Sequence, residues 1–153
     1  MTGRSDRSGG LKLCALRAGE QEFVLDLMRV EEVLRPGAVT PLPRTPAFVE
    51  GVIELRDTLV PVVNLRACLG LEPLERPGPR ERFMVCLLGR RRVALRVDAA
   101  LEVMRVERGA LRPAPPLSAW AGAPFVVGAV GPPTKLRLLL DLKVLLRRTE
   151  AAA

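Results

Sequence analysis

The sequence predicts an all-β protein built from two small β-barrels packed side by side, with short helical segments. Three observations support this fold class. Short apolar runs alternate with turn signals about every 8–12 residues, which is typical of small barrels. The two halves of the chain repeat the same order of motifs. Hydrophobic residues make up 48% of the 153 residues, enough for a core in one domain or in two subdomains that share one.

The first half begins with a predicted hairpin. Residues 11–16 and 23–27 are apolar runs on either side of a turn at Ala18-Gly19-Glu20. Residues 28–34 are either a strand, an irregular edge or a short helical face. Residues 39–46 contain three prolines, which lack the N–H that a strand ladder needs, so an extended edge or loop is expected.

The stretch from 46 to 65 has the clearest organisation. Residues 49–55 are predicted as a strand, Arg56-Asp57-Thr58 as its turn and residues 59–65 as the return strand, with Pro61 marking an edge or a bulge. Residues 66–70 resemble one helical turn stopped by glycine. The segment from 72 to 82 is rich in proline, glycine and charge, so it is predicted as a loop.

The second half repeats this plan. Residues 82–98 form a predicted hairpin whose Gly89-Arg90 loop suits a type II′ turn. Residues 102–111 echo 28–34, and 112–124 form a proline-rich connection. Residues 125–130 and 136–142 form a final strand pair, and 142–148 a closing helix with arginine at its C-terminal end.

Matched spacings relate the two halves. Gly51 precedes Asn64-Leu65 by thirteen residues, and Gly128 precedes Asp141-Leu142 by thirteen. Cys14-x-Leu16 likewise matches Cys86-x-Leu88. The repeat predicts subdomains at roughly 11–75 and 80–148, with strand exchange between them allowed. A groove between two such barrels would be a usual place for binding.

Composition limits the chemistry. The chain has no histidine and three widely spaced cysteines, which excludes His-based triads and most zinc sites and fits buried thiols in a reducing cytoplasm. Residues 1–10 are polar, without the apolar core of a signal peptide, so we expect a flexible tail there and another at 149–153. The longest uncharged stretches fall well short of the roughly 18 apolar residues that span a bilayer.

The stretch TPAFVEGVIELRD, followed by LVPVVNLR, resembles the signature of the CheW-like family of chemotaxis coupling proteins. Matching marks in the second half are Val97-Asp98 before Glu102-Val103, then Arg112-Pro113-Ala114-Pro115, Gly128 and Leu139-Leu140-Asp141-Leu142. The resemblance covers residues 11–148, nearly the whole chain.

The resemblance implies a fold of two SH3-like five-stranded barrels and an adaptor rather than an enzyme, with no cofactor or metal. The implied partners are the cytoplasmic tip of a methyl-accepting chemoreceptor and the regulatory domain of a CheA-type histidine kinase. The implied location is cytoplasmic, within chemoreceptor arrays.

Carried over by position, the receptor-binding and coupling sites of the family fall on Val30, Glu32, Gly51, Arg56 and Val103. Val30 and Val103 could pack against a receptor helix, or could be ordinary core. Glu32 and Arg56 could form an ion pair that sets the turn. Gly51 would allow close backbone approach or a positive φ.

Two residues depart from the family pattern. Asp57 stands where the family has glycine, and Glu54 where it has asparagine. Asp57 tolerates a positive φ better than most residues, yet it could divert Arg56 from Glu32. The added carboxylates raise the alternative of an accessory protein that binds receptor but not kinase.

The net charge of +7 raises a further alternative, a basic surface that docks on nucleic acid or another polyanion. Its candidate contacts are Arg90, Arg91, Arg92 and Arg96. The low aromatic content, 3%, argues against binding by base stacking.

Overall fold

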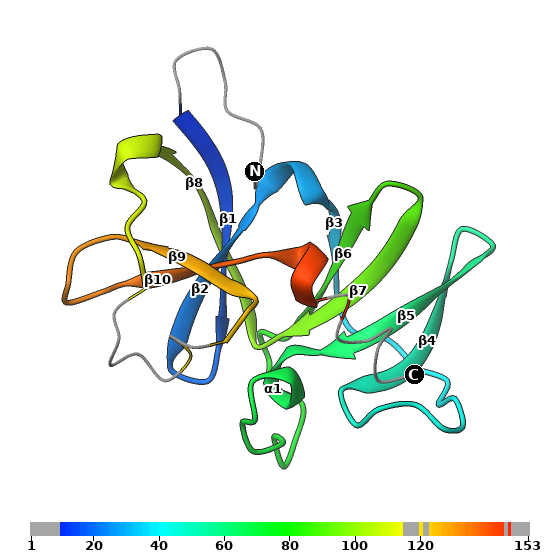
Figure 1. Cartoon of the computed structure of the whole chain (residues 1–153). Helices are drawn as coiled ribbons and strands as arrows, with labels where there is room; N and C mark the ends of the chain where they lie inside the picture. Colours follow the sequence, from blue (N-terminus) through cyan, green and yellow to red (C-terminus); the bar gives the residue numbers. More distant parts are fainter. Residues whose placement is uncertain (1–9, 115–119, 121–122, 146, 148–153) are drawn as a thin grey trace.

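The computed structural model describes residues 10–114, 120, 123–145 and 147. One five-stranded sheet, here called barrel A, has the strand order β8-β1-β2-β10-β9. Its strands are β1 (Gly10–Ala18), β2 (Gln21–Asp26), β8 (Ala99–Glu107), β9 (Val126–Val130) and β10 (Arg137–Leu140). Figure 1 shows this barrel at the left.

The second sheet, barrel B, has the order β3-β6-β7-β5-β4 and lies at the right of Figure 1. Its strands are β3 (Val30–Leu34), β4 (Val49–Leu55), β5 (Thr58–Asn64), β6 (Arg82–Leu88) and β7 (Arg91–Val97). Short helices η1 (Leu27–Arg29), α1 (Leu65–Cys68) and η2 (Arg108–Ala110) connect the strands, and residues 142–145 and 147 are helical. The prediction of two five-stranded barrels is confirmed.

The two halves of the chain exchange strands. The first half supplies β1 and β2 to barrel A and β3, β4 and β5 to barrel B, while the second half supplies β6 and β7 to barrel B and the remaining strands to barrel A. A boundary between 75 and 80 therefore does not separate the barrels. Barrel B is continuous in sequence over residues 30–97, and barrel A is assembled from the chain on both sides of it.

The parallel pairs that join the exchanged pieces follow the repeat. Val62 of β5 lies beside Ala94 of β7, and Leu139 of β10 lies beside Val24 of β2. Both sheets close through one isolated backbone bridge, Thr40 with Val52 in barrel B and Arg112 with Ala129 in barrel A. The repeat is thus a repeat of pairing as well as of sequence.

Local sequence explains the tight turns and the strand proline. Gly89 has a φ of 62° and begins a two-residue loop between Leu88 and Arg91, as predicted for the 82–98 hairpin. Pro61 lies opposite Val52, whose N–H and C=O both bond to Thr40 at 2.9 Å on the other side. The missing N–H of Pro61 therefore breaks no ladder bond with β4.

One apolar core joins the barrels. Its buried members come from both sheets and include Phe23, Leu25, Met84, Leu95 and Leu138. Smaller clusters fill each barrel, around Leu13 and Val24 in barrel A and around Val60 and Phe83 in barrel B. Side chains from the two sheets pack against each other in this shared core, so the two barrels form one packed unit.

Candidate functional site

The β4–β5 hairpin ends in a two-residue turn with an unusual backbone. Leu55 pairs with Thr58, and the intervening Arg56 and Asp57 have φ values of 50° and 63°. Two successive positive φ values are the signature of a type I′ turn, which matches the right-handed twist of the flanking strands. Thr58, predicted as part of the turn, is the first residue of β5. Asp57 therefore holds a left-handed conformation that glycine would adopt without cost.

Arg56 is paired with β3 across the open rim of barrel B. Its Nη1 lies 2.7 Å from Glu32 Oε1 and 3.8 Å from Glu31 Oε1. Glu32 Oε1 is buried and accepts no hydrogen bond, so the guanidinium is its counterion in the described structure. The predicted ion pair between Glu32 and Arg56 is present, and Asp57 does not divert the arginine. The side chain of Arg56 nevertheless stays 64% exposed.

A β-bulge explains why two consecutive glutamates reach the same arginine. Neighbouring residues of a regular strand point to opposite faces. In the pairing of β3 with β6, however, Val30 lies opposite Cys86 and Glu32 opposite Val85, so Glu31 is an extra residue. Such a bulge re-aims side chains at the edge of a sheet. Glu31 also accepts from Arg92 Nε, at 2.9 Å for Oε1 and 3.2 Å for Oε2.

Gly51 serves the backbone of barrel B. Its φ is 146°, and a Cβ at this position would lie 2.0 Å from the carbonyl oxygen of Thr40. The absence of a side chain lets residue 40 pair with Val52 and close the barrel. Gly128 occupies the equivalent position in barrel A, where a Cβ would lie 3.3 Å from the carbonyl oxygen of Arg112. We therefore assign Gly51 to the scaffold that carries the turn.

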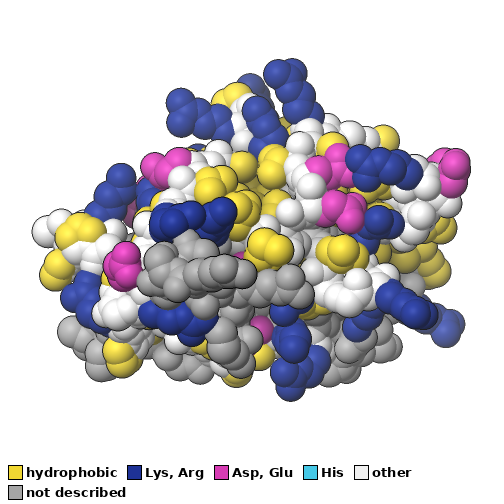
Figure 2. Space-filling view, turned by 90° about the horizontal axis from the view of Figure 1, so that it is seen from above, with side chains coloured by type: hydrophobic (Ala, Val, Ile, Leu, Met, Phe, Trp, Pro, Cys, Tyr) yellow, Lys and Arg dark blue, Asp and Glu magenta, His cyan; other side chains and the backbone are white. Residues whose placement is uncertain are grey.

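Val30 and Val103 lie on the edge strands β3 and β8 and differ in exposure. Val30 is partly buried against the shared core, whereas Val103 is 58% exposed. Figure 2, which looks down on the molecule from above, shows apolar side chains gathered near the centre of this face with charged side chains on both sides. Of the two valines, Val103 is the one whose surface is available to a partner.

The four arginines proposed as polyanion contacts do not form one free patch. Arg92 is held by Glu31, and Arg96 is 18% exposed, with its Nε 2.6 Å from Glu50 and its Nη1 3.2 Å from Glu81. The Arg96 guanidinium also lies 4.8 Å from the ring centre of Phe83. Arg90 and Arg91 are exposed at the β6–β7 turn. The charges of Arg92 and Arg96 are therefore balanced within the protein.

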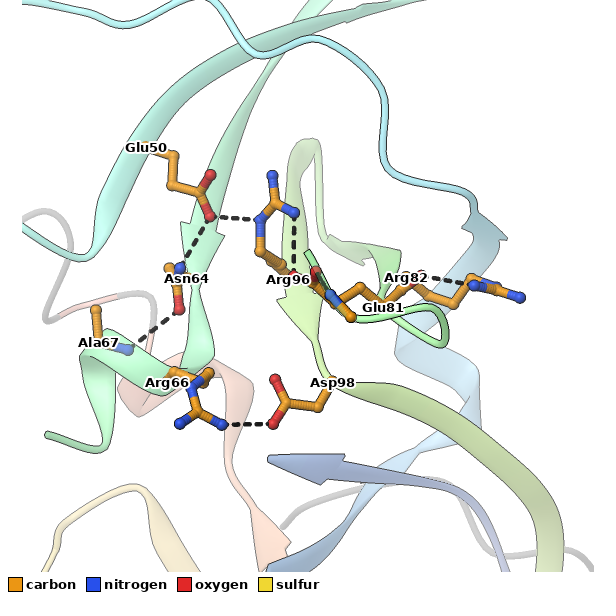
Figure 3. Close-up of polar contacts among 9 residues, drawn as sticks. Glu50, Asn64, Arg66, Ala67, Glu81, Arg82, Arg96 and Asp98 are labelled. Carbon is orange, nitrogen blue, oxygen red and sulfur yellow. Dashed lines mark hydrogen bonds and ion pairs between the residues drawn. The ribbon is translucent and has the colours of Figure 1, made fainter. Parts of the chain in front are cut away.

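A second charged cluster, not predicted from the sequence, lies where α1 meets both barrels. Arg66 Nη1 is 2.7 Å from Asp98 Oδ2, and the same oxygen accepts from the Gly19 N–H at 2.7 Å. Figure 3 shows this pair beside the Glu50–Arg96–Glu81 cluster. A cavity of about 260 Å³ lies between them and the 73–77 loop. The positions of Arg66 and Asp98 in the sequence do not predict this contact, because the contact depends on strand exchange between the two halves.

The described residues contain no group of three or more Cys, Asp or Glu side chains that could hold a metal ion. None of the described helices is long and apolar enough to cross a membrane. All three cysteines are buried, and none of them forms a disulfide. Burial raises the pKa of the Cys86 thiol to about 12, with a further contribution from Cys14, and burial also raises the pKa of Cys14. Neither thiol is a ready nucleophile at neutral pH.

Comparison with known proteins identifies the family to which this chain is similar. The family model described as "CheW-like domain" matches residues 12–150. A "Probable chemotaxis protein CheW" of Rhizobium etli is 32% identical over 150 residues, covering 98% of this chain and 96% of that protein. "Protein FrzA" of Myxococcus xanthus is 36% identical over 114 residues, covering 74% of this chain and 70% of its own.

A solved structure has the same architecture. The scaffolding protein TtCheW from Thermoanaerobacter tengcongensis superimposes with a TM-score of 0.76 and 26% sequence identity, covering 86% of this chain and 88% of that one. The likeness extends over both barrels, and not over one barrel alone.

Proposed function

This chain belongs to the CheW-like domain family, and from that premise we propose that it is a chemotaxis adaptor that couples chemoreceptors to a CheA-type histidine kinase. We place the receptor contact on the upper face of the molecule, at the Arg56 turn and the edge strands β3 and β8. The location that goes with this role is the cytoplasmic receptor array.

One observation carries this assignment. Arg56 is held at a fixed position by Glu32 while its side chain remains 64% exposed. Its closest contacts with Glu31 and Glu32 both come from Nη1. An exposed guanidinium on a tight turn can bind an acceptor oxygen on a helix. Val103 offers an exposed apolar contact on β8 of the other barrel.

Binding to the two partners, measured separately, tests the proposal. The purified protein is titrated with the cytoplasmic tip of its cognate receptor and with the regulatory domain of its kinase. We expect Arg56→Ala to weaken receptor binding and to leave kinase binding unchanged. Because the Arg56 side chain is 64% exposed, water can take its place beside Glu32, and the variant should remain folded. Arg90→Ala, an exposed arginine of the β6–β7 turn, is the matched control. No measurable binding of the unaltered protein to either partner would refute the adaptor role.

A second candidate is an accessory adaptor that binds receptor but not kinase. It is favoured by Glu54 and Asp57, two exposed carboxylates on the β4–β5 hairpin at positions where the family pattern has neutral residues. The double substitution Glu54→Asn with Asp57→Gly restores that pattern. If these carboxylates prevent kinase coupling, the variant should activate the kinase in reconstituted arrays more strongly than the unaltered protein. Equal activation by both proteins would count against this candidate.

A further inference from the structure

The ion pairs at the rim of barrel B form a chain of four side chains. The order is Arg92, Glu31, Arg56 and Glu32, with alternating charges, and its closest contacts are 2.9, 3.8 and 2.7 Å. We infer that Glu31 and Arg92 are positioning residues that set the place of Arg56 for receptor binding. This inference rests on the proposed receptor contact of Arg56 and extends it to two residues outside the family signature.

This chain of ion pairs connects β3 with the tip of the β4–β5 hairpin, which the backbone hydrogen bonds leave apart. In barrel B, β3 and β4 are the two edges of the sheet and do not pair with each other. The bridge between Thr40 and Val52 joins β4 to the connection that follows β3. The hairpin tip at Arg56 lies four residues beyond that bridge. Contacts between side chains therefore have to hold the tip against β3.

Arg92 orients the carboxylate of Glu31. Its Nε donates to both carboxylate oxygens of Glu31, and the side chains of Arg92 and Glu31 are 36% and 24% exposed. One N–H is thus shared between the two oxygens, and this contact keeps the Glu31 carboxylate facing Arg92 while Oε1 lies 3.8 Å from Arg56 Nη1. Without Arg92, Glu31 would be free to rotate toward solvent or to pair more closely with Arg56. Either movement would shift the guanidinium relative to Glu32.

The charge balance of the chain has a second consequence. Arg56 faces two carboxylates, and Arg92 compensates one of them. The four side chains are then neutral together, so the exposed donors of Arg56 are offered to a partner without a surplus of negative charge behind them. The corresponding bulge position of the second half is Leu101, and the turn there has Pro133 in place of Arg56. Barrel A has a different ion chain, in which Arg137 pairs with Glu22 at 2.6 Å and with Glu102 at 2.7 Å. The order Arg92, Glu31, Arg56 and Glu32 is thus specific to barrel B.

The first test compares two arginines of the same hairpin. We expect Arg92→Gln to weaken binding to the isolated receptor tip by about two- to fivefold, the range that one partly exposed ion pair allows. Arg90→Gln, which removes the same charge from the adjacent turn, should leave receptor affinity unchanged. Amide hydrogen exchange of residues 56–58, measured without any partner, should be faster in Arg92→Gln than in Arg90→Gln.

A charge exchange separates positioning from simple stabilisation. The double variant Glu31→Arg with Arg92→Glu restores an ion pair between β3 and β7 but places a cation next to Arg56. If the pair served only to join the two strands, this variant would bind receptor like the unaltered protein. We expect it to bind at least as weakly as Arg92→Gln, with unchanged thermal stability relative to Arg90→Gln.

The outcomes are distinct. Weaker binding by both Arg92→Gln and the charge exchange, with faster exchange of the turn amides, supports the inference. Equal receptor affinity of Arg92→Gln and Arg90→Gln overturns it and leaves the adaptor role intact. Full recovery of binding in the charge exchange also overturns it. Failure of the unaltered protein to bind the receptor tip overturns the proposed receptor contact, and this inference with it.

Discussion

At the scale of single residues, Gly51 is the position where the backbone leaves least room for a side chain. A Cβ would lie 2.0 Å from the Thr40 carbonyl oxygen, and the φ of 146° is strained for any other residue. We expect Gly51→Ala to lower the free energy of unfolding by about 2–4 kcal/mol, because the bridge that closes barrel B must open. Urea denaturation followed by circular dichroism measures the change.

Gly37→Ala is the control for this substitution. Gly37 lies in the β3–β4 connection, three residues before Thr40, and a Cβ there would meet nothing within 4 Å. The control should change stability by less than about 1 kcal/mol. Similar losses in the two variants would contradict the assignment of the Gly51→Ala effect to the Thr40 contact.

The buried thiol of Cys86 makes stability depend on alkaline pH. Its pKa is raised from the ordinary 9.0 to about 12 in the folded protein, so folding favours the protonated form. The stabilisation is complete below pH 9 and is lost as pH rises toward 12, because the unfolded chain releases the proton first. The free energy of unfolding should therefore fall by about 1.4 kcal/mol per pH unit in that window, beyond the contribution of other groups.

Denaturation curves of the unaltered protein and of Cys86→Ala, recorded between pH 8 and 11, isolate this effect. The chain contains no tyrosine, so that common source of alkaline titration is absent. Cys86→Ala loses stability at every pH through the cavity it creates, but its slope above pH 9 should be smaller. Parallel slopes for the two proteins would contradict the assignment to Cys86.

Some contacts of single residues could be predicted from the sequence alone, and others could not. The Arg56–Glu32 pair and the glycine requirement at Gly51 were expected, because the family resemblance assigns these positions. Glu31 and Arg92 were missed as partners, since a strand pattern places Glu31 and Glu32 on opposite faces. The bulge that brings them together is a property of pairing with β6.

At the scale of elements, the contact between α1 and the β7–β8 junction links barrel B to the β1–β2 turn of barrel A. Arg66 on α1 and Asp98 after β7 are 17% and 8% exposed, and Asp98 also binds the β1–β2 turn through Gly19. We expect Asp98→Asn to lower the free energy of unfolding by about 2–3 kcal/mol, because Arg66 would keep its charge in a partly buried place without a counterion. Chemical denaturation at pH 7 checks this value.

Glu75→Gln provides the comparison, since it removes one carboxylate from an exposed loop position of the neighbouring 72–80 segment. Its effect should stay within about 0.5 kcal/mol. If Asp98→Asn is equally mild, then solvent must reach Arg66 readily enough to replace the carboxylate.

Element positions were predicted closely, and element partners less so. Residues 49–55 were expected as a strand and form β4, and the 82–98 hairpin appears as β6 and β7. Residues 28–34, left open between strand and helix, divide into η1 and β3. Local periodicity determines such segments, whereas the pairing of β1 with β8 joins residues far apart in sequence and depends on burial over the whole chain.

At the scale of the whole molecule, the exchange of strands makes each half of the chain incomplete. A cut in the loop between α1 and β6 would separate β1–β5 from β6–β10, and each fragment would carry strands of both barrels and part of the shared core. Neither fragment could bury its apolar faces alone. We therefore expect fragments 1–77 and 78–153 to unfold without cooperativity when separate and to assemble with each other when mixed.

The single tryptophan reports this assembly. Trp120 belongs to the second fragment, and its ring lies 5.5 Å from that of Phe23 in the first. Its Nε1 donates to the carbonyl oxygen of Leu69, also in the first fragment, at 3.1 Å. Mixing should shift tryptophan emission to shorter wavelength and restore a cooperative thermal transition. A first fragment carrying Phe23→Leu should assemble with a smaller shift, because the ring contact is lost. Cooperative unfolding of fragment 1–77 alone would show that β1–β5 can pair among themselves, and the exchange would then not be required for folding.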